Sequence, residues 1–186
     1  MVRPPACSRL RRLLARFEQA RSGSTAVEFA LVALPFLALL FAIIELGMIY
    51  LISTTLSDAT TDVAREIRTC QLQGKVSVQK DLETDICNDG AMTWLGGLCT
   101  SNIYSDSTVY TSFSASNSAS SPISSKTLNM SSNNAVNIGA AGDIVLLRTY
   151  YTWGLVVPGL DGLVAQLSNG NFVVEAAAVF RNEPCT

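Results

Sequence analysis

The residues best placed to do chemistry in this sequence lie where a basic segment meets a long apolar one. Gly23 comes first, Glu28 follows five residues later, and Phe29 comes directly after it. A glycine has no side chain to obstruct an enzyme that binds the extended backbone. If the chain is cut after Gly23, Ser24 gains an amino group near lipid, where an unpaired charge is costly. Glu28 is then the natural group to neutralise it.

Composition argues against most catalytic sites. The chain has no histidine, which removes Ser–His and Cys–His nucleophiles and any histidine-ligated metal. No GxxxxGK[ST] or GxGxxG phosphate loop occurs. Basic residues gather in one N-terminal block without interleaved aromatic residues, so nucleic-acid binding is not indicated. We therefore expect no enzyme activity, no cofactor, no metal and no nucleic-acid partner.

One dense acidic group would suit a membrane-tethered hydrolase, but its spacing on a helix is typical of a solvated face. Its members are Asp81, Glu83, Asp85 and Asp89.

A membrane-spanning helix must position the residues around Gly23. Hydrophobic residues make up 48% of the 186 residues and charged residues only 15%, against about 25% in a typical soluble domain. Residues 29–44 carry no charge, and apolar residues continue after Glu45 to Ile52. A helix over 29–52 would be about 36 Å long, which exceeds the ~30 Å hydrocarbon core. We therefore predict one span there rather than a core helix of a soluble protein.

Charge asymmetry predicts the orientation of this span. Residues 1–21 hold six arginines and one glutamate, so the positive-inside rule places a leader, residues 1–23, in the cytoplasm. Residues after about 53 would then lie outside. We expect Pro35 to kink or loosen the helix, and Glu45 to lie near the outer interface. Glu28 and Glu45 are about 100° apart around the helix, so they do not form one site.

The leader, cleavage motif and span together resemble the type IV prepilin signal and, over a longer stretch, the TadE-like pilus-assembly proteins of the tight adherence system. The resemblance covers residues 22–70 and, less closely, 143–184. The matching strings are Gly23-Ser-Thr-Ala-Val-Glu-Phe-Ala-Leu-Val with Pro35, Ile43-Ile-Glu-Leu-Gly47, Tyr150-Tyr-Thr-Trp153 with Pro158, and Phe180-Arg-Asn-Glu-Pro184.

The resemblance implies a pseudopilin or minor pilin, matured by a prepilin peptidase that cuts after Gly23. It also implies that Glu28 pairs with the Ser24 amino terminus of a neighbouring subunit. The implied partners are that peptidase, other pilins or pseudopilins and the pilus assembly machinery. The implied role is assembly of a tight adherence pilus in surface attachment and biofilm formation, from the inner membrane or within the pilus itself.

Beyond the span we expect an α+β fold: a long helix over 24–71 that forms a pilin-like spine, and a small exported head over 72–186. The apolar residues that predict the spine's buried stripe are Leu56, Ala59, Val63, Ala64 and Ile67. The expected elements of the head are a helix over 76–95, strands over 102–114, 143–153 and 171–181, and a short helix over 160–167. The strands would form an antiparallel sheet. Residues 114–134 include nine serines and predict a solvated loop.

Four cysteines predict two disulfides on the oxidising side of the membrane. Cys7 lies in the leader, and the mature chain keeps Cys70, Cys87, Cys99 and Cys185. No C-x-x-C pair occurs, so thiol-redox and zinc sites are not indicated. Three pairings are open. We favour Cys87–Cys99, linking the second helix to the following strand, which leaves Cys70–Cys185 to join the end of the spine to the chain terminus.

Two other interpretations of the N-terminus remain open. A permanently anchored periplasmic binding or scaffold protein would keep Met1 and its leader. An ordinary secretory signal would be cut before Thr60, after the small residues of Ser57-Asp-Ala59, although the apolar segment is longer than such signals use.

Overall fold

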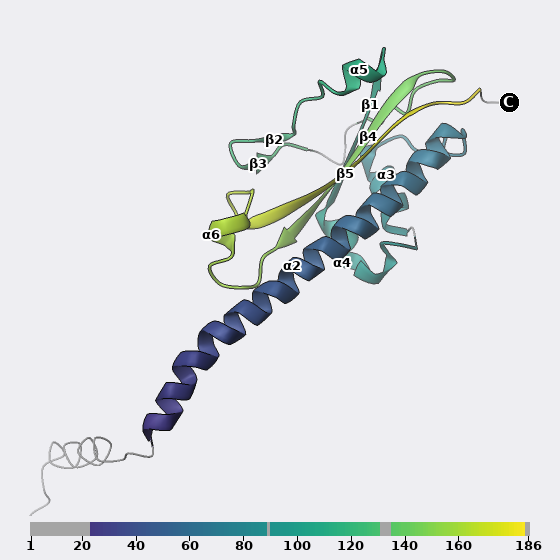
Figure 1. Cartoon of the computed structure of the whole chain (residues 1–186). Coiled ribbons are helices and arrows are strands. Elements are labelled where there is room, and N and C mark those ends of the chain that lie inside the picture. The colour runs from purple at the N-terminus through teal and green to yellow at the C-terminus, as the bar shows by residue number, and fades with distance from the viewer. Residues whose placement is uncertain (1–22, 89, 131–134, 185–186) are drawn as a thin grey trace, which may run out of the picture. The chain divides into compact units, whose positions relative to one another are not determined.

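The computed structural model describes residues 23–88, 90–130 and 135–184. The chain divides into two compact units, one up to Ile43 and one from Ile44 onward. Helix α2, Ser24–Arg68, runs through both and passes Pro35 without interruption (Figure 1). The predicted long N-terminal helix is therefore confirmed. Residues 1–22 of the predicted leader, which runs to Gly23, lie outside the described residues.

In the second unit, α2 buries one face. The five residues predicted as its stripe are all buried, together with Ile49 and Ile52. Their spacing of three and four residues keeps them on one side of the helix. Two arginines near its end, Arg65 and Arg68, complement the helix dipole.

A three-stranded antiparallel sheet forms the centre of the head, in the order β1-β4-β5. The strands are β1 (Ile103–Tyr110), β4 (Ile144–Gly154) and β5 (Asn171–Arg181). They agree with the three predicted strands, and the α+β fold is confirmed. β-Branched and aromatic residues are dense in β4 and β5, which suits a pleated surface.

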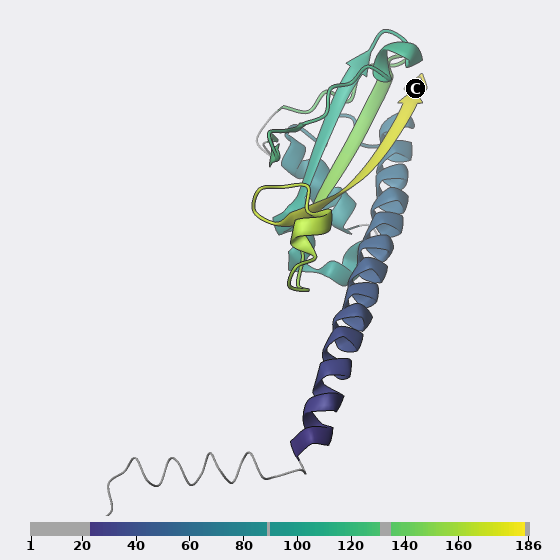
Figure 2. The ribbon, with the colours of Figure 1, turned by 60° about the vertical axis from the view of Figure 1, so that its left-hand side comes forward.

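The sheet packs one face against the second half of α2. On that face β4 places Val145, Leu147 and Tyr151 in one hydrophobic core with Ile52 and Leu56 of α2. Both views of the ribbon show the sheet alongside this part of the helix (Figure 2). The helix stripe and the alternating strand pattern therefore bury each other.

The predicted second helix over 76–95 is wrong as a single element. The structure has α3 (Gln79–Asn88), a 3-10 turn η2 (Thr93–Leu95) and α4 (Gly97–Asn102). Glycines explain the breaks: Gly90 follows α3, and Gly96 between η2 and α4 has a φ of 52°, in the left-handed region. Five apolar residues suggested one helix by their spacing: Leu82, Ile86, Met92 and Leu95 are buried, and Val78 is half-buried.

The serine-rich segment is not simply a solvated loop. Its described part holds the short helix α5 (Phe113–Ser116) and a hairpin of β2 (Ile123–Ser124) and β3 (Thr127–Leu128). Ile123, Leu128 and Met130 pack around Tyr150 on the outer face of the sheet. These three apolar residues, among many serines, pack the segment against the sheet. Helix α6 (Asp161–Val164) falls within the short helix expected over 160–167.

Candidate processing and assembly site

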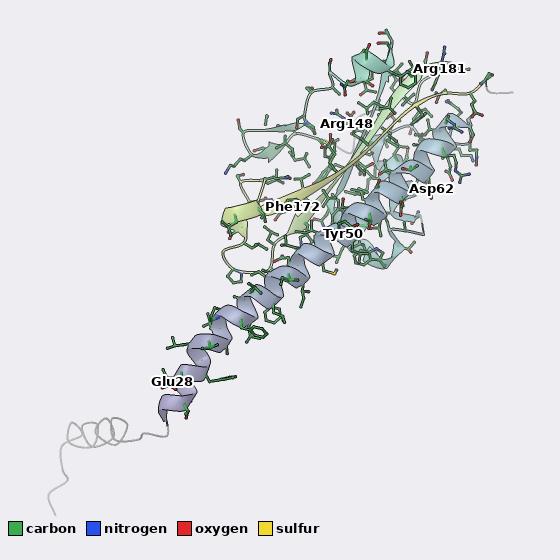
Figure 3. The ribbon with its side chains drawn as sticks, viewed as in Figure 1. Glu28, Tyr50, Asp62, Arg148, Phe172 and Arg181 are labelled. Atoms are coloured by element: carbon green, nitrogen blue, oxygen red, sulfur yellow. A yellow bond between two sulfur atoms is a disulfide. The ribbon has the colours of Figure 1, made fainter. Side chains whose placement is uncertain are left out.

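The cleavage motif lies where α2 begins. Gly23 forms a 3-10 turn and Ser24 is the first residue of α2. Positions 24 and 28 are four residues apart on this helix, so they share a face about 6 Å apart along the axis. Glu28 and Phe29 are exposed, and Glu28 lies near the start of the helix in Figure 3. The new amino group and the carboxylate would thus belong to one surface.

The segment after this motif exposes apolar side chains on every side. Its large members are Val27, Phe29, Leu31, Val32, Leu34, Phe36, Leu37, Leu39, Leu40, Phe41, Ile43 and Ile44, which are 39–74% exposed. The most apolar 18-residue window of the helix has a mean hydropathy of 2.6 and none of it is buried. A helix that is apolar all round needs lipid or other helices around it. This segment fits a single-pass membrane anchor.

Glu45 ends the uncharged run and is buried, with 6% of its surface exposed. One carboxylate oxygen accepts a hydrogen bond from the backbone N–H of Val156 at 2.6 Å, and the other from that of Val157 at 2.9 Å. Hydrogen bonds to an ionised acceptor are about twice as strong as neutral ones. Glu45 therefore faces the head and not lipid. The sequence suggested the position near the interface but offered no sign of this partner.

The structure also shows where the exposed apolar stretch of α2 ends. From Glu45 onward one face of α2 is covered, and Ile49 and Ile52 belong to the core of the head. The expected span over 29–52 therefore includes residues that pack on protein. The fully exposed apolar run ends at about Ile44.

The disulfide Cys87–Cys99 is confirmed, with its Cα atoms 5.8 Å apart. It joins α3 to α4, so the expected link to a strand is wrong. Cys70 is disulfide-bonded, and its predicted partner Cys185 lies outside the described residues. Nearby contacts bring the C-terminal segment to the end of α2. The guanidinium of Arg68 lies 3.2 Å from the carboxylate of Glu183, and the backbone N–H of Glu183 donates to the backbone carbonyl of Arg68 at 3.0 Å.

The acidic group on α3 is not one solvated face. Glu83 is fully buried and accepts a hydrogen bond from the backbone N–H of Ser105 at 3.2 Å. Lys80 lies 3.6 Å from its other oxygen. Asp89 lies outside the described residues. Among the described residues, no cluster of acidic or cysteine side chains could hold a metal ion.

Asp81 and Asp85 respond oppositely to their surroundings. Backbone N–H groups of Ser77 and Val78 donate to Asp81 and lower its pKa. The carboxylate of Asp81 thus caps the start of α3 by accepting these backbone hydrogen bonds. Burial, followed by the charge of Asp81, raises the pKa of Asp85.

A polar network crosses the outer face of the sheet. Arg148 of β4 pairs with Asp106 of β1 and donates to the carbonyl of Ser120 at 2.7 Å. Burial lowers the pKa of Arg148, but the hydrogen bond to Asp106 and the charges of Tyr150, Asp106 and Tyr110 together outweigh it, so the net shift is upward. Tyr150 donates to Glu175 at 3.0 Å. The network ties the serine-rich segment to the sheet, which is a structural role.

Comparison with known proteins bears on the N-terminal part of the chain. The model of a family described as TadE-like protein matches residues 23–65. No curated protein and no solved structure gave a match. The match begins at Gly23, includes Glu28 and Glu45, and stops before the head. The resemblance drawn from the sequence is thereby confirmed over residues 23–65, which are similar to the TadE-like family.

Proposed function

We propose that this chain is a minor pilin or pseudopilin of a tight adherence, type IV-like pilus, with a structural and not a catalytic role. One observation carries the proposal. A continuous helix begins at Ser24, directly after the glycine where the family match starts, and its first twenty residues or so expose apolar side chains all round. Such a surface suits a subunit that is stored in lipid and later packs against other helices.

Maturation on this proposal is cleavage of the Gly23–Ser24 bond by a prepilin peptidase at the cytoplasmic face of the inner membrane. The basic leader stays in the cytoplasm and the head is periplasmic. The freed amine of Ser24 then needs a counter-charge in a low-dielectric setting. Glu28 of a neighbouring subunit supplies it as the subunit joins a filament or a priming complex, and the head remains available for contacts with other subunits or a surface.

The decisive experiment is the intact mass and N-terminal sequence of the protein from native membranes and from sheared surface filaments. We expect a chain that starts at Ser24, and no such chain when the peptidase is inactive or in Gly23→Val. Among the described residues no atom lies within 4 Å of a Cβ built on Gly23 or on Gly47. Gly47→Val, in the same helix, is therefore the matched control and should be processed normally.

The other outcomes point to the other interpretations. A chain that starts at Met1 would contradict maturation and favour a permanent anchor. A chain that starts at Thr60 would mean a secretory signal. That cut would remove Ile52 and Leu56 from the core and split α2 at the buried Ala59, so the fold disfavours it.

A further inference from the structure

We propose that the loop between β4 and α6, with the start of α6, docks on the outer surface of the bilayer. This docking loop comprises residues 155–163, and the carboxylate of Glu45 latches it to α2. The partner is the lipid surface itself, at the level of the headgroups. The proposal rests on α2 being a membrane anchor and does not depend on cleavage or pilus assembly.

The hydrogen bonds of Glu45 fix the position of the loop along α2. Glu45 is the first ionisable residue after the uncharged run 29–44, so the hydrocarbon core ends near it. Its two hydrogen bonds to the backbone of Val156 and Val157 hold the loop beside this turn of α2. On the same turn Ile44 and Leu46 are about half exposed. The docking loop therefore lies beside the turn of α2 that directly follows the uncharged run.

The surface of the docking loop is unusually apolar for a head in water. Val156 is 78% exposed and Leu163 is 83% exposed, the two highest values among the large apolar side chains of the described residues. Residues 155–160 carry no charge. Contact with the interfacial region of the bilayer would remove both side chains from water.

An exposed carboxylate in the loop limits how deeply the loop can enter the bilayer. Asp161 begins α6 and is exposed, and a carboxylate is costly in the hydrocarbon core. The loop is thus suited to the headgroup region. At the opposite end of the sheet, the exposed Phe113 follows Tyr110, which pairs with Ile144 at the far end of β4 from Gly154. Phe113 is therefore an exposed apolar residue far from the proposed contact, and it serves as the control position for Val156 and Leu163.

The test uses the full chain in vesicles of phosphatidylethanolamine and phosphatidylglycerol. A photo-crosslinking amino acid, p-benzoylphenylalanine, replaces Val156, Leu163 or Phe113 in separate variants. We expect several-fold more lipid adduct at 156 and 163 than at 113. Equal yields at the three positions would overturn the proposal, as would crosslinks from 156 and 163 mainly to a second copy of the chain. Failure of the chain to float with the vesicles would overturn the anchor and the docking together.

The latch is tested separately. Glu45→Ala should raise hydrogen exchange at the Val156 and Val157 amides and lower the lipid adduct at 156 several-fold. Glu66→Ala, on the same helix, should change neither. Formation of the Cys87–Cys99 disulfide reports folding, and Glu45→Gln offers a milder variant that keeps the shape of the side chain. Faster exchange with no loss of lipid adduct would contradict the latch.

Discussion

At the residue scale, two glutamates on one helix have different surroundings. Glu28 is exposed on the apolar segment, within one turn of the helix start. Glu45 is buried against the head and satisfied by two backbone N–H groups. A carboxylate near lipid is costly wherever it stands. On our proposal Glu28 balances the Ser24 amine of a neighbouring subunit in the assembled state, whereas Glu45 accepts two hydrogen bonds from the head of its own subunit.

Replacing Glu28 therefore separates processing from assembly. We expect Glu28→Gln to be cut after Gly23 and to remain in the membrane, with little of it in sheared filaments, because the neutral amide cannot balance the Ser24 amine. N-terminal sequencing of both fractions measures this. Normal recovery of the variant from filaments would contradict the pairing role of Glu28.

The capping carboxylate of α3 predicts a pH-dependent stability. The folded-state pKa of Asp81 lies below its usual value of 3.8, so its contribution is present above that value and is lost as the pH falls through the folded pKa. Asp81→Asn should lower the melting temperature at pH 7, and the difference from the wild type should shrink as the pH falls below 3.8.

Asp85 serves as a control, because its pKa shift has the opposite sign to that of Asp81. Because burial raises its pKa in the folded state, its charge opposes folding above its folded-state pKa. Asp85→Asn should leave stability unchanged or raise it at neutral pH. A loss of stability like that of Asp81→Asn would contradict this assignment.

At the element scale, α2 fits a membrane anchor up to about Ile44 and is the core helix of the head beyond Glu45. The change is visible in burial: residues up to Ile44 expose apolar side chains, whereas beyond Glu45 one face is covered by the sheet. Large-to-small substitutions should therefore have different costs along the same helix.

Leu56 is fully buried, and Leu51 on the same helix is 44% exposed. Leu56→Ala should lower the free energy of unfolding of the head by about 2–5 kcal/mol, and Leu51→Ala by clearly less. Denaturant unfolding in detergent, followed by tryptophan fluorescence, measures both. Equal costs would mean that the helix does not pack on the sheet as described.

The disulfide between α3 and α4 should also contribute stability. It closes a short loop, with a sequence separation of 12, and such bonds typically contribute about 2–4 kcal/mol. Cys87→Ala with Cys99→Ala should lower the free energy of unfolding by that order. Alanine suits these positions because both sulfurs are buried. An undiminished stability would show that the bond adds little.

At the scale of the whole molecule, the chain combines an anchor and a head with separate surfaces. The family match covers the anchor and the first part of the core helix, residues 23–65, and not the sheet. Functions common to TadE-like proteins would reside in the matched segment. The serine-rich cover of the sheet and the docking loop belong to the head and lie outside the matched segment.

Orientation is testable on the whole chain. We expect the protein to resist alkaline carbonate extraction and its head to be digested by protease added to spheroplasts, because the arginines of the leader favour the cytoplasmic side. Protection of the head in intact spheroplasts, with digestion only after lysis, would contradict the proposed topology.

Features that depend on neighbouring residues could be predicted from the sequence alone. The apolar run, the buried stripe that includes Leu56 and Ile67, and the β-rich segments 144–154 and 171–181 follow from periodicity and local preference. The helix breaks after Asn88 and at Gly96 also have a sign in the sequence, because a glycine lies at or near each of them. The prediction of one helix followed the helical spacing of Leu82, Ile86 and Met92 instead.

Contacts between residues far apart in the sequence could not be predicted in this way, because they form only when the whole chain folds. The bonds of Glu45 to Val156 and Val157 span more than a hundred residues, and Glu83 is buried because β1 lies over it. Periodicity shows which face of a helix or strand is apolar. It does not show which backbone N–H groups will donate hydrogen bonds to the polar residues of that helix or strand. Those partners depend on the packing of the whole head, where burial obliges each charged group to find a donor.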